Sequence, residues 1–598
     1  MRYQLKPNMQ YGVDNESADP NRESGAIEFD GGPQGIATVA SDTFPLSQAQ
    51  LGMWYAQHVD PEVPINIAQY VDVRGPLDAA LLERAMVIGS AEIETGYLRL
   101  AEVDGRPYQV VDFSIEDHLR LADFRAHDDP ERAAHEWMQA EYSRPMDLLS
   151  DRLITAAVLQ IEDERYLWYS RVHHIALDGF GAMAYMTRTA ELYSALLEGR
   201  ELPRAKASTL RSIYESEVAY RDSTRFKVDG EYWAERIAGM EEGTSLSGRT
   251  AAPASVNGVA SAALSEDSAK NLASAVAQQN SSPAAMLIAA FAGYLAQMTD
   301  TEDVVLSLPV TARTTALMRH SGGMLSNVVP LRLRVGTDTT VADLLKSVQI
   351  AVSGALRHQR YRHEDIRRDS GSGNMQRDLL GPLVNIMLFH NEVTLGAVTG
   401  QFHILSTGTV EDLAVNFYQS VAGTRTHIDF ETNPNLYTDE QAKAHHARFL
   451  TFFDQFLAAD PARRVWDLTV TTEAERTLSV SGWNATDRVV GDGTLVSLFD
   501  ARVGLSPGAV ALSFEGESVT YSEFDVRVNR LARHLISVGV GPESLVALAM
   551  RRSIDLLVGV YAVVKAGGAY VPVDPDQPAD RIGNILDTAA PVCVLSTS

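Results

Sequence analysis

Two histidines, a carboxylate and a glycine lie within seven residues of this chain, in the run His173-His174-Ile175-Ala176-Leu177-Asp178-Gly179. An imidazole titrates near neutral pH, so histidine is well suited to take up or release a proton during a reaction. A nearby carboxylate can pair with a cation or cap a helix, and glycine permits a tight turn. This run is therefore the first place to look for chemistry.

The flanking residues predict the elements that hold this run. Residues 166–172 are aromatic and β-branched, which is typical of a half-buried strand, and residues 152–160 predict its partner in a hairpin with a turn at 162–165. Downstream, apolar residues recur at helical spacing. They are Met183, Met186, Ala190, Tyr193 and Leu197. The run is thus predicted to connect a strand to a helix.

Successive side chains of a strand point to opposite faces, so His173 and His174 cannot both face one cavity unless the backbone bends between them. We expect one histidine to be the working group. Asp178 stands just before Gly179, where it could cap the helix or pair with a cation, and we expect a structural role for it. Taken alone, two adjacent histidines are also compatible with a satisfied pair in the core.

The spacing His-His-x-x-x-Asp-Gly is the core motif of the chloramphenicol-acetyltransferase-like superfamily, and this sequence resembles the condensation domains of nonribosomal peptide synthetases. Further segments resemble the family's other sequence blocks, in the family's order. They are residues 47–54 (SQAQLGMW), 309–313 (PVTAR), 323–332 (GMLSNVVPLR), 357–361 (RHQRY) and 381–389 (GPLVNIMLF). The resemblance covers residues 41–470 and is greatest to the enterobactin-type synthetases.

One block departs from the family's pattern. Where many relatives read Arg-His-Glu-x-Leu-Arg-Thr-x-Phe, residues 92–100 read EIETGYLRL, which keeps Glu94 and Arg99 but lacks the first Arg-His pair. Aryl-accepting relatives also vary here, so we interpret the change as a mark of subtype. It leaves the donor class open.

The resemblance implies a fold and a set of site residues. The implied fold is α/β, with two chloramphenicol-acetyltransferase-like lobes in a V around a central channel. His174, the second histidine of the motif, is the implied catalytic group, acting either as a base or as a positioning and electrostatic group. The implied supporting residues are His173, Asp178, Gly179, Arg313 and Asn385. Among them, Asp178 and Arg313 are implied to form an ion pair between the lobes.

The bulk composition excludes several classes of protein. At 598 residues the chain is too long for one core, and we expect about three to five domains. Its net charge of −27 argues against a nucleic-acid or anionic-membrane partner. A single cysteine, Cys593, excludes an internal disulfide framework and a cysteine-rich zinc site, and we expect no bound metal. Without a long apolar run or a secretory signal, the chain is predicted to be cytoplasmic.

Changes in composition along the chain predict five regions. Residues 1–40 are polar and are predicted to form a disordered tail, with a docking segment for a partner protein as the alternative. The lobes are joined by a helix-rich stretch at 210–239 and a loop at 245–259. The remaining regions are the N-terminal lobe at 41–214, the C-terminal lobe at 215–468, a linker at 469–490 and an adenylation-like region at 491–598.

This last region resembles the start of an adenylation domain. Residues 520–524 (TYSEF) and 565–574 (KAGGAYVPVD) resemble that family's first two motifs, and strand and helix patterns alternate between them. The sequence stops before a phosphate-binding loop that could hold ATP. We therefore expect this truncated α/β subdomain not to activate an amino acid.

The resemblance implies that the chain joins a carrier-bound donor acyl thioester to the amine of a carrier-bound aminoacyl thioester in secondary-metabolite biosynthesis, of which siderophore assembly is one case. The site then has to position two arms, handle the amine proton and stabilise an oxyanion. No cofactor is expected to bind directly, since the phosphopantetheine arms of the carriers are substrates. The expected partners are a donor peptidyl or aryl carrier protein in trans and an acceptor carrier domain downstream in the parent protein.

Three other functions stay open at this point. An epimerisation domain shares the histidine motif but normally follows a carrier domain, whereas an adenylation start follows here. An inactive platform that recruits carriers is compatible with the altered block at 92–100. A stand-alone acyltransferase could use a small thioester such as acyl-CoA. The donor could be aryl, fatty acyl or peptidyl, and the acceptor amino acid is not indicated.

Overall fold

The computed structural model describes residues 43–116, 118–240, 243–369, 381–387, 392–419 and 426–597. The predicted tail at 1–40 lies outside the described residues, as do Leu388 and Phe389 of the last family segment. The chain forms two compact units, of which one ends at Thr477 and the other begins at Leu478. This boundary lies inside the segment 469–490, where the structure has the short helix α13 (Glu473–Thr477).

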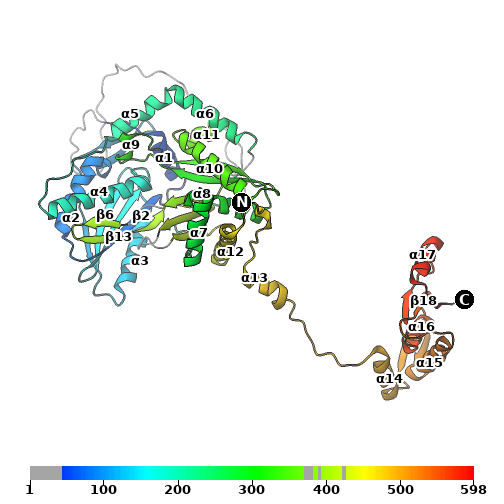
Figure 1. Ribbon diagram of the computed structural model, residues 1–598. Helices are drawn as coiled ribbons and strands as arrows, with labels where there is room; N and C mark the ends of the chain where they lie inside the picture. Colours follow the sequence, from blue (N-terminus) through cyan, green and yellow to red (C-terminus); the bar gives the residue numbers. More distant parts are fainter. Residues whose placement is uncertain are drawn as a thin grey trace. The chain divides into compact units, whose positions relative to one another are not determined.

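A six-stranded sheet forms the first layer of the larger unit, with the strand order β12-β13-β2-β7-β6-β5. Figure 1 labels β2, β6 and β13 of this sheet. The predicted hairpin is part of this sheet, in which β6 pairs antiparallel with β7. The strands are β2 (Asn66–Arg74), β5 (Arg120–Asp123), β6 (Ile154–Glu162), β7 (Arg165–His173), β12 (Glu392–Leu395) and β13 (Val398–Thr407).

Helices cover both faces of this first sheet. The side chains of Val71 and Val73 pack with α2 (Ala79–Ile93) and α4 (Gly179–Leu197), which lie side by side. The alternate side chains, Ala68 and Tyr70, pack on the opposite face with α3 (Pro130–Tyr142). This alternation follows from the two-residue period of a strand, and it explains why the core strands are buried on both faces.

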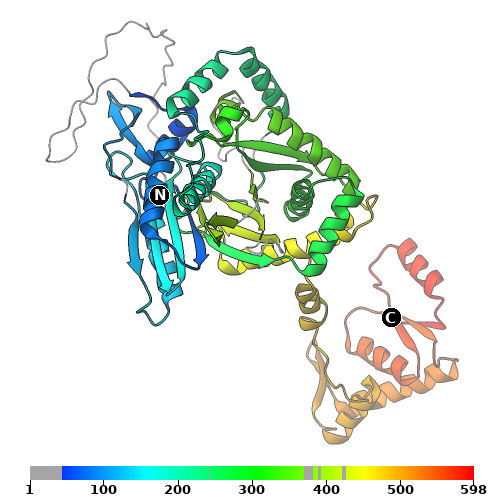
Figure 2. The same cartoon turned by 60° about the vertical axis from the view of Figure 1, so that its left-hand side comes forward.

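A second six-stranded sheet has the order β10-β9-β11-β14-β15-β8. Its strands are β8 (Gly258–Ala263), β9 (Asp303–Val310), β10 (Asn327–Arg334), β11 (Leu383–Met387), β14 (Leu413–Gln419) and β15 (Thr426–Thr432). Apolar side chains of this sheet form one core with helices of the same unit (Figure 2). These helices include α7 (Glu266–Gln278), α8 (Pro283–Thr299), α10 (Val341–Arg357) and α12 (Asp439–Ala458).

The two lobes are not separated by one boundary in the sequence at residue 214. The hairpin of β12 and β13 falls within the predicted C-terminal lobe, 215–468, yet β13 pairs antiparallel with β2 of the first sheet. Without this hairpin β2 would be an edge strand with unpaired backbone groups, so the crossover completes the first sheet. Such a long-range pairing leaves no local signal in the sequence, and the predicted boundary misses it.

Smaller elements complete the unit. The stretch at 210–239 forms α5 (Leu210–Arg221) and α6 (Thr224–Ile237), as its pattern predicts. Segment 47–54 begins the helix α1 (Gln48–Val59). The other elements are β1 (Phe44–Pro45), β3 (Leu98–Val103), β4 (Arg106–Val111), α9 (Ala316–Arg319) and α11 (His363–Asp369).

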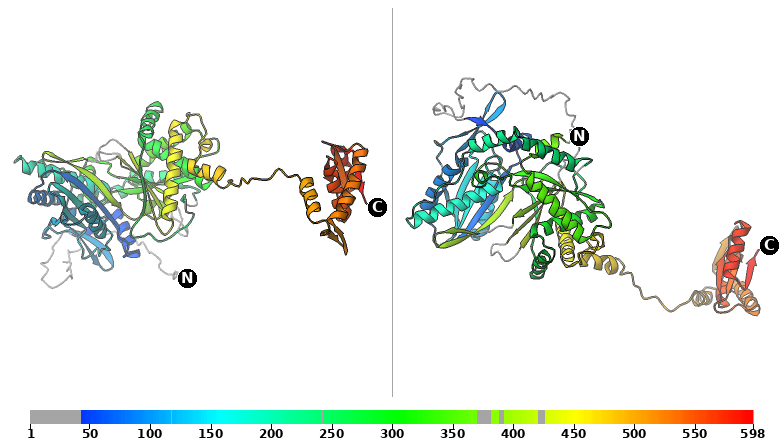
Figure 3. Two further views of the ribbon diagram at one scale, coloured as in Figure 1. Left: turned by 90° about the horizontal axis from the view of Figure 1, so that it is seen from below. Right: turned by 45° about the horizontal axis from the view of Figure 1, so that its top comes forward.

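The unit that begins at Leu478 has its own core and alternates strands with helices (Figure 3). Its elements are α14 (Leu495–Leu505), the hairpin β16 (Val510–Phe514) and β17 (Glu517–Thr520), α15 (Tyr521–Ser537), α16 (Ile554–Lys565) and α17 (Ala579–Ala589), and the parallel strands β18 (Leu545–Ala549), β19 (Ala569–Pro572) and β20 (Cys593–Ser596). Thr520 and Glu523 of the TYSEF segment form a capping box at the start of α15.

Candidate active site

The histidine motif lies on the predicted strand-to-helix connection. His173 is the last residue of β7, and Asp178 caps the amino terminus of α4. The backbone turns directly after His173: its carbonyl accepts from the N–H of Ala176 at 2.9 Å, and the N–H of His174 donates to Ile65 O at 3.0 Å. This bend lets the two imidazoles occupy different surroundings.

The first histidine is a fully buried structural group. The N–H of Ile175 donates to His173 Nδ1 at 3.1 Å, so the ring proton resides on Nε2, which donates to Gln57 Oε1 at 3.1 Å. Burial lowers the pKa of His173 to about 3, with smaller effects from His174 and Arg171. His173 is therefore neutral at physiological pH with both nitrogens engaged.

The second histidine keeps a nitrogen for chemistry. Among the described residues, His174 Nδ1 is buried and has no hydrogen-bond partner. Burial lowers the pKa of His174, although the charge of Asp178 and a backbone hydrogen bond with Thr407 oppose this shift. A neutral imidazole with an unused nitrogen can accept a proton or orient a substrate N–H.

Gly408 lies against the ring of His174. A Cβ at position 408 would lie 3.5 Å from Cδ2 and 3.8 Å from Nε2 of His174, and the backbone there has φ +106°, which favours glycine. Gly408, which has no side chain, therefore packs against the Cδ2–Nε2 edge of the imidazole.

Asp178 is saturated with hydrogen bonds. Its Oδ1 accepts from the N–H of Gly181 at 2.8 Å, and its Oδ2 accepts from the N–H groups of Leu325 at 3.0 Å and Ser326 at 2.8 Å, and from Arg313 Nη1. Burial alone would raise the pKa of Asp178, but the charge and hydrogen bond of Arg313 and the backbone donors lower it below its usual value. Asp178 is thus a buried carboxylate that stays ionised.

Arg313 completes the link from the side of the second sheet. It follows β9, and it also donates from Nη1 to Thr311 O and from Nη2 to Gly323 O, both at 3.3 Å. Its guanidinium carbon lies 5.0 Å from the ring centroid of Phe180. The ion pair therefore joins the connection at 174–178 to the loops beside β9 and β10, and neither side chain is open to a substrate.

Gly179 and Asn385 occupy different positions. Gly179 begins α4, where a Cβ would meet no atom within 4 Å, so packing does not require glycine there. Asn385 lies on β11, and its Nδ2 donates to Asn416 Oδ1 at 3.2 Å on the neighbouring β14. The structure thus brings His174, Asp178 and Arg313 together at one connection and places Asn385 on the second sheet.

Other family segments support these loops. Gln50 of segment 47–54 donates to Ile175 O at 3.3 Å, inside the histidine connection. Gln359 of segment 357–361 accepts from the N–H of Ala312 at 2.9 Å, beside Arg313. Glu94 of the divergent block accepts from the N–H of Leu210 at 2.7 Å, at the start of α5. These side chains hold backbone segments in place.

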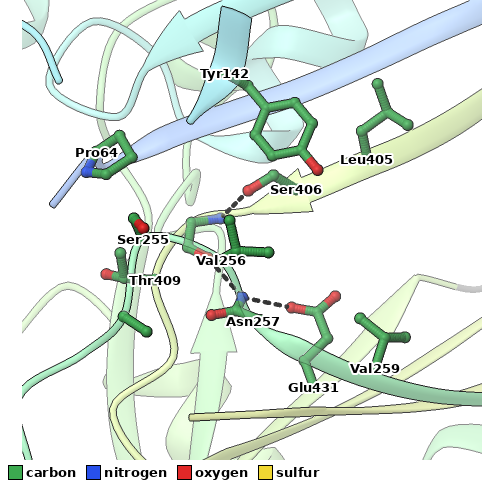
Figure 4. Close-up of a pocket in the computed structure, with 12 residues that line it drawn as sticks. Pro64, Tyr142, Ser255, Val256, Asn257, Val259, Leu405, Ser406, Thr409 and Glu431 are labelled. Atoms are coloured by element: carbon green, nitrogen blue, oxygen red, sulfur yellow. Dashed lines mark hydrogen bonds between the residues drawn. The ribbon is translucent and has the colours of Figure 1, made fainter. Parts of the chain in front are cut away.

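Gly408 also lines a cavity of about 60 Å³ (Figure 4). Its lining residues are Pro64, Tyr142, Ala254, Ser255, Val256, Asn257, Val259, Leu405, Ser406, Gly408, Thr409 and Glu431. Glu431 Oε2 accepts from Asn257 Nδ2 and from Thr407 Oγ1, both at 3.3 Å, and Oε1 accepts from Asn416 Nδ2 at 2.9 Å. Burial raises the pKa of Glu431 to about 7, with a further contribution from Asp429.

Sequence reasoning did not find three of these residues. Gln57 lies just beyond the segment 47–54 and contacts His173 across 116 positions of sequence. Gly408 follows the crossover strand β13, and Glu431 lies in β15 among alternating polar and apolar residues. The sequence around Gln57 and Glu431 has no pattern that indicates a functional role. For Gly408, the isolated glycine after a strand is the one indication that the sequence offers.

Comparison with known families agrees with the geometry. Residues 40–478 match the family model described as "Condensation domain", and residues 499–598 match the one described as "AMP-binding enzyme". Among the described residues, no group of three His, Cys, Asp or Glu side chains could hold a metal ion, and no helix has the length and hydropathy of a membrane span.

Curated relatives are synthetases that are longer than this chain. The dimodular nonribosomal peptide synthase of Bacillus subtilis is 34% identical over 93% of this chain and 23% of its own length. The isonitrile lipopeptide synthase of Streptomyces coeruleorubidus is 35% identical over 93% of this chain and 38% of its own length. Enterobactin synthase component F of Escherichia coli O157:H7 is 30% identical over 93% of this chain and 43% of its own length. The chain spans less than half the length of each.

Solved structures show the same fold. A variant of the starter condensation domain of rhizomide synthetase, in complex with C8-CoA, superposes with a TM-score of 0.68 at 32% identity over 72% of this chain and 98% of that one. The first condensation domain of the calcium-dependent antibiotic synthetase superposes with a TM-score of 0.67 at 32% identity, over 72% of this chain and 100% of that one. The chain therefore belongs to the condensation-domain family of nonribosomal peptide synthetases, which are acyltransferases that form amide bonds, and it continues into the start of an AMP-binding domain.

Proposed function

We propose that this chain joins a carrier-bound donor acyl thioester to the amine of a carrier-bound aminoacyl thioester, with His174 as the catalytic group. The observation that carries the proposal is that Nδ1 of a neutral His174 has no hydrogen-bond partner in the described residues, on a connection whose far end is fixed by the buried ion pair of Asp178 and Arg313. We further propose that residues 41–214, with the hairpin of β12 and β13, and the remainder of 215–468 act as the two lobes.

The chemistry needs little more than positioning. The amine nitrogen attacks the thioester carbonyl, the new C–N bond forms, the C–S bond breaks, and the amine proton ends on the released thiol. His174 hydrogen-bonds the attacking N–H and can carry that proton to the thiolate. His173 and the ion pair fix the backbone that carries His174, which is the preorganisation such a reaction requires.

For the donor we propose an acyl group without a free amine, with a medium-chain fatty acyl thioester as the first choice and an aryl thioester as the second. The solved starter domain that binds C8-CoA and the lipopeptide synthase among the relatives favour the fatty acyl group. The aryl group and a siderophore product are the alternative that the resemblance to enterobactin-type synthetases implies. A carrier protein in trans would deliver the donor, and a carrier domain downstream in the parent protein would deliver the acceptor.

The test is amide formation from separately loaded donor and acceptor carriers, followed by mass spectrometry, with fatty acyl, aryl and aminoacyl donors in parallel. His174→Ala should slow amide formation by about 10²–10⁴-fold without unfolding the chain. His118→Ala, at an exposed histidine of the same unit, is the matched control and should retain the parental rate. No product from any donor would instead support the inactive platform, and parental turnover by His174→Ala would exclude His174 as the catalytic group.

A further inference from the structure

Within the described part of the chain, the cavity that Gly408 lines contains a buried acid without a counter-ion. Glu431 is the one carboxylate among the described lining residues, and none of these residues is Lys, Arg or His. Its three partners are the neutral groups of Asn257, Thr407 and Asn416. A carboxylate buried in this way is poorly stabilised, because uncharged donors do not replace an opposite charge. Among the described lining residues, no cation therefore balances the charge of Glu431 when it is ionised.

The other titratable groups around Glu431 do not supply one. Asp429, on the same strand, accepts from the hydroxyl of Tyr418 at 2.7 Å, and its charge raises the pKa of Glu431. Tyr142, which lines the cavity, has a pKa raised by burial and by Glu431. His174, on the far side of Gly408, is neutral. A positive group that enters the cavity would stabilise the ionised form of Glu431.

One reactant of the proposed reaction carries such a group. The amine of an aminoacyl thioester is protonated in part near neutral pH, since α-amino groups titrate at about 7.7–8.0. A cavity of about 60 Å³ has room for a few atoms, and Gly408 forms its border with the imidazole. An ammonium held there lies on the other side of Gly408 from the Cδ2–Nε2 edge of the His174 ring.

We propose that Glu431 and this cavity bind the protonated α-amine of the acceptor, so that Glu431 is the residue that distinguishes an aminoacyl acceptor from a neutral one. The proton can then pass from the ammonium to the carboxylate, which leaves a neutral amine with its lone pair and a neutral Glu431 carboxylic acid. This inference rests on the proposed function, but the cavity's preference for a cation is separable from turnover.

The first experiment needs no turnover and no variant. Titration calorimetry compares two non-reactive pantetheine amides that differ only in their α-substituent, one with an amine and the other with a hydroxyl. The wild-type chain should bind the amine about 10- to 100-fold more tightly, as expected for one charge-assisted hydrogen bond. Equal affinity for the two compounds would overturn the proposal, whether or not the chain forms amides.

The second experiment assigns the preference to Glu431. Glu431→Gln keeps the size and the hydrogen-bonding oxygen, and it should reduce the preference for the amine to less than about threefold and raise the acceptor KM about tenfold or more, with the donor KM unchanged. Glu392→Gln is the matched control, at an exposed carboxylate of β12 outside the cavity, and should keep the preference. A rise in donor KM alone, or an unchanged acceptor KM in a variant that melts normally, would contradict the assignment. Absence of amide from the wild-type chain would count against the proposed function and leave the binding comparison intact.

Discussion

Arg313 donates a hydrogen bond to Asp178 across the junction of the two sheets, and each side chain is 1% exposed. A guanidinium does not lose its proton in a protein, so the positive charge of Arg313 stays buried whether or not its partner is present. The pair also fixes the loop at 323–326, because Asp178 accepts from two of its backbone N–H groups. The stability of this junction and the position of His174 are thereby coupled.

Asp178→Ala should therefore destabilise the first unit by about 3–5 kcal/mol, since it leaves a buried charge unpaired. Tryptophan fluorescence during urea unfolding measures this change, because five of the six tryptophans precede Leu478. Asp163→Asn is the control: Asp163 pairs with Arg125, but its side chain is 92% exposed, so water screens this pair and the unfolding midpoint should stay near that of the wild type. Equal unfolding midpoints for the two variants would show that the buried pair does not hold the junction.

His173 should make the first unit sensitive to mild acid. The unfolded chain binds a proton at this histidine below about pH 6.5, whereas the folded chain does not until about pH 3. The unfolded state therefore holds more protons in this window, and stability should fall by about 1.4 kcal/mol for each unit of pH below 6.5. His173→Asn, which retains an acceptor for the Ile175 N–H, should abolish this part of the pH dependence.

The measurement is the difference in unfolding free energy between wild type and His173→Asn at pH 7, 6 and 5. This difference should shrink steadily as the pH falls, because only the wild-type chain loses the contribution. A constant difference over this range would mean that His173 is protonated in the folded chain as readily as in the unfolded one.

Glu431 should give a pH dependence of stability opposite in sign to that of His173. Its pKa is about 7 when folded and 4.5 in its ordinary state, so the folded chain holds the extra proton between these values. Its contribution to stability is fully present below about pH 4.5 and is lost as pH rises through 7, by about 3 kcal/mol in all. Glu431→Gln cannot ionise and should remove this loss. If wild type and variant show the same change between pH 5 and pH 8, the carboxyl is not buried as the structure has it.

Much of the site followed from local sequence. The aromatic strand, the helix after it and the capping position of Asp178 are all properties of neighbouring residues, and the structure has each of them. The separate surroundings of His173 and His174 also follow from strand geometry together with a bend. The family resemblance then added the partner of Asp178, because Arg313 is 135 positions away and its own segment does not indicate an ion pair.

The parts that escaped prediction depend on pairing over long distances. The strand that carries Ser406 enters the first sheet only because β2 has a free edge, and the pairing of β13 with β2 places Gly408 beside His174. Glu431 is buried because Asn257, Thr407 and Asn416 arrive from three different segments. Its own neighbours in sequence, Phe430 and Thr432, give an ordinary strand pattern, from which a surface carboxylate is the natural expectation.

The small size of residue 408 should matter to catalysis beyond its effect on the backbone. Gly408→Ala places a methyl group 3.5 Å from Cδ2 of His174, at the border between the imidazole and the Glu431 cavity, and it also strains a backbone with φ +106°. Gly105→Ala is the matched control, because Gly105 has φ +73° but a Cβ there meets no atom within 4 Å. Gly105→Ala should destabilise the unit by about 1–2 kcal/mol, the cost of a left-handed conformation for a residue with a side chain, and Gly408→Ala by at least as much, because its φ lies further from the left-handed helical region. Gly408→Ala alone should also reduce kcat for amide formation, by about 10- to 100-fold, because the methyl group occupies space needed to align the amine with His174. If the two variants retain the same kcat, the space at Gly408 is not part of the path of the acceptor.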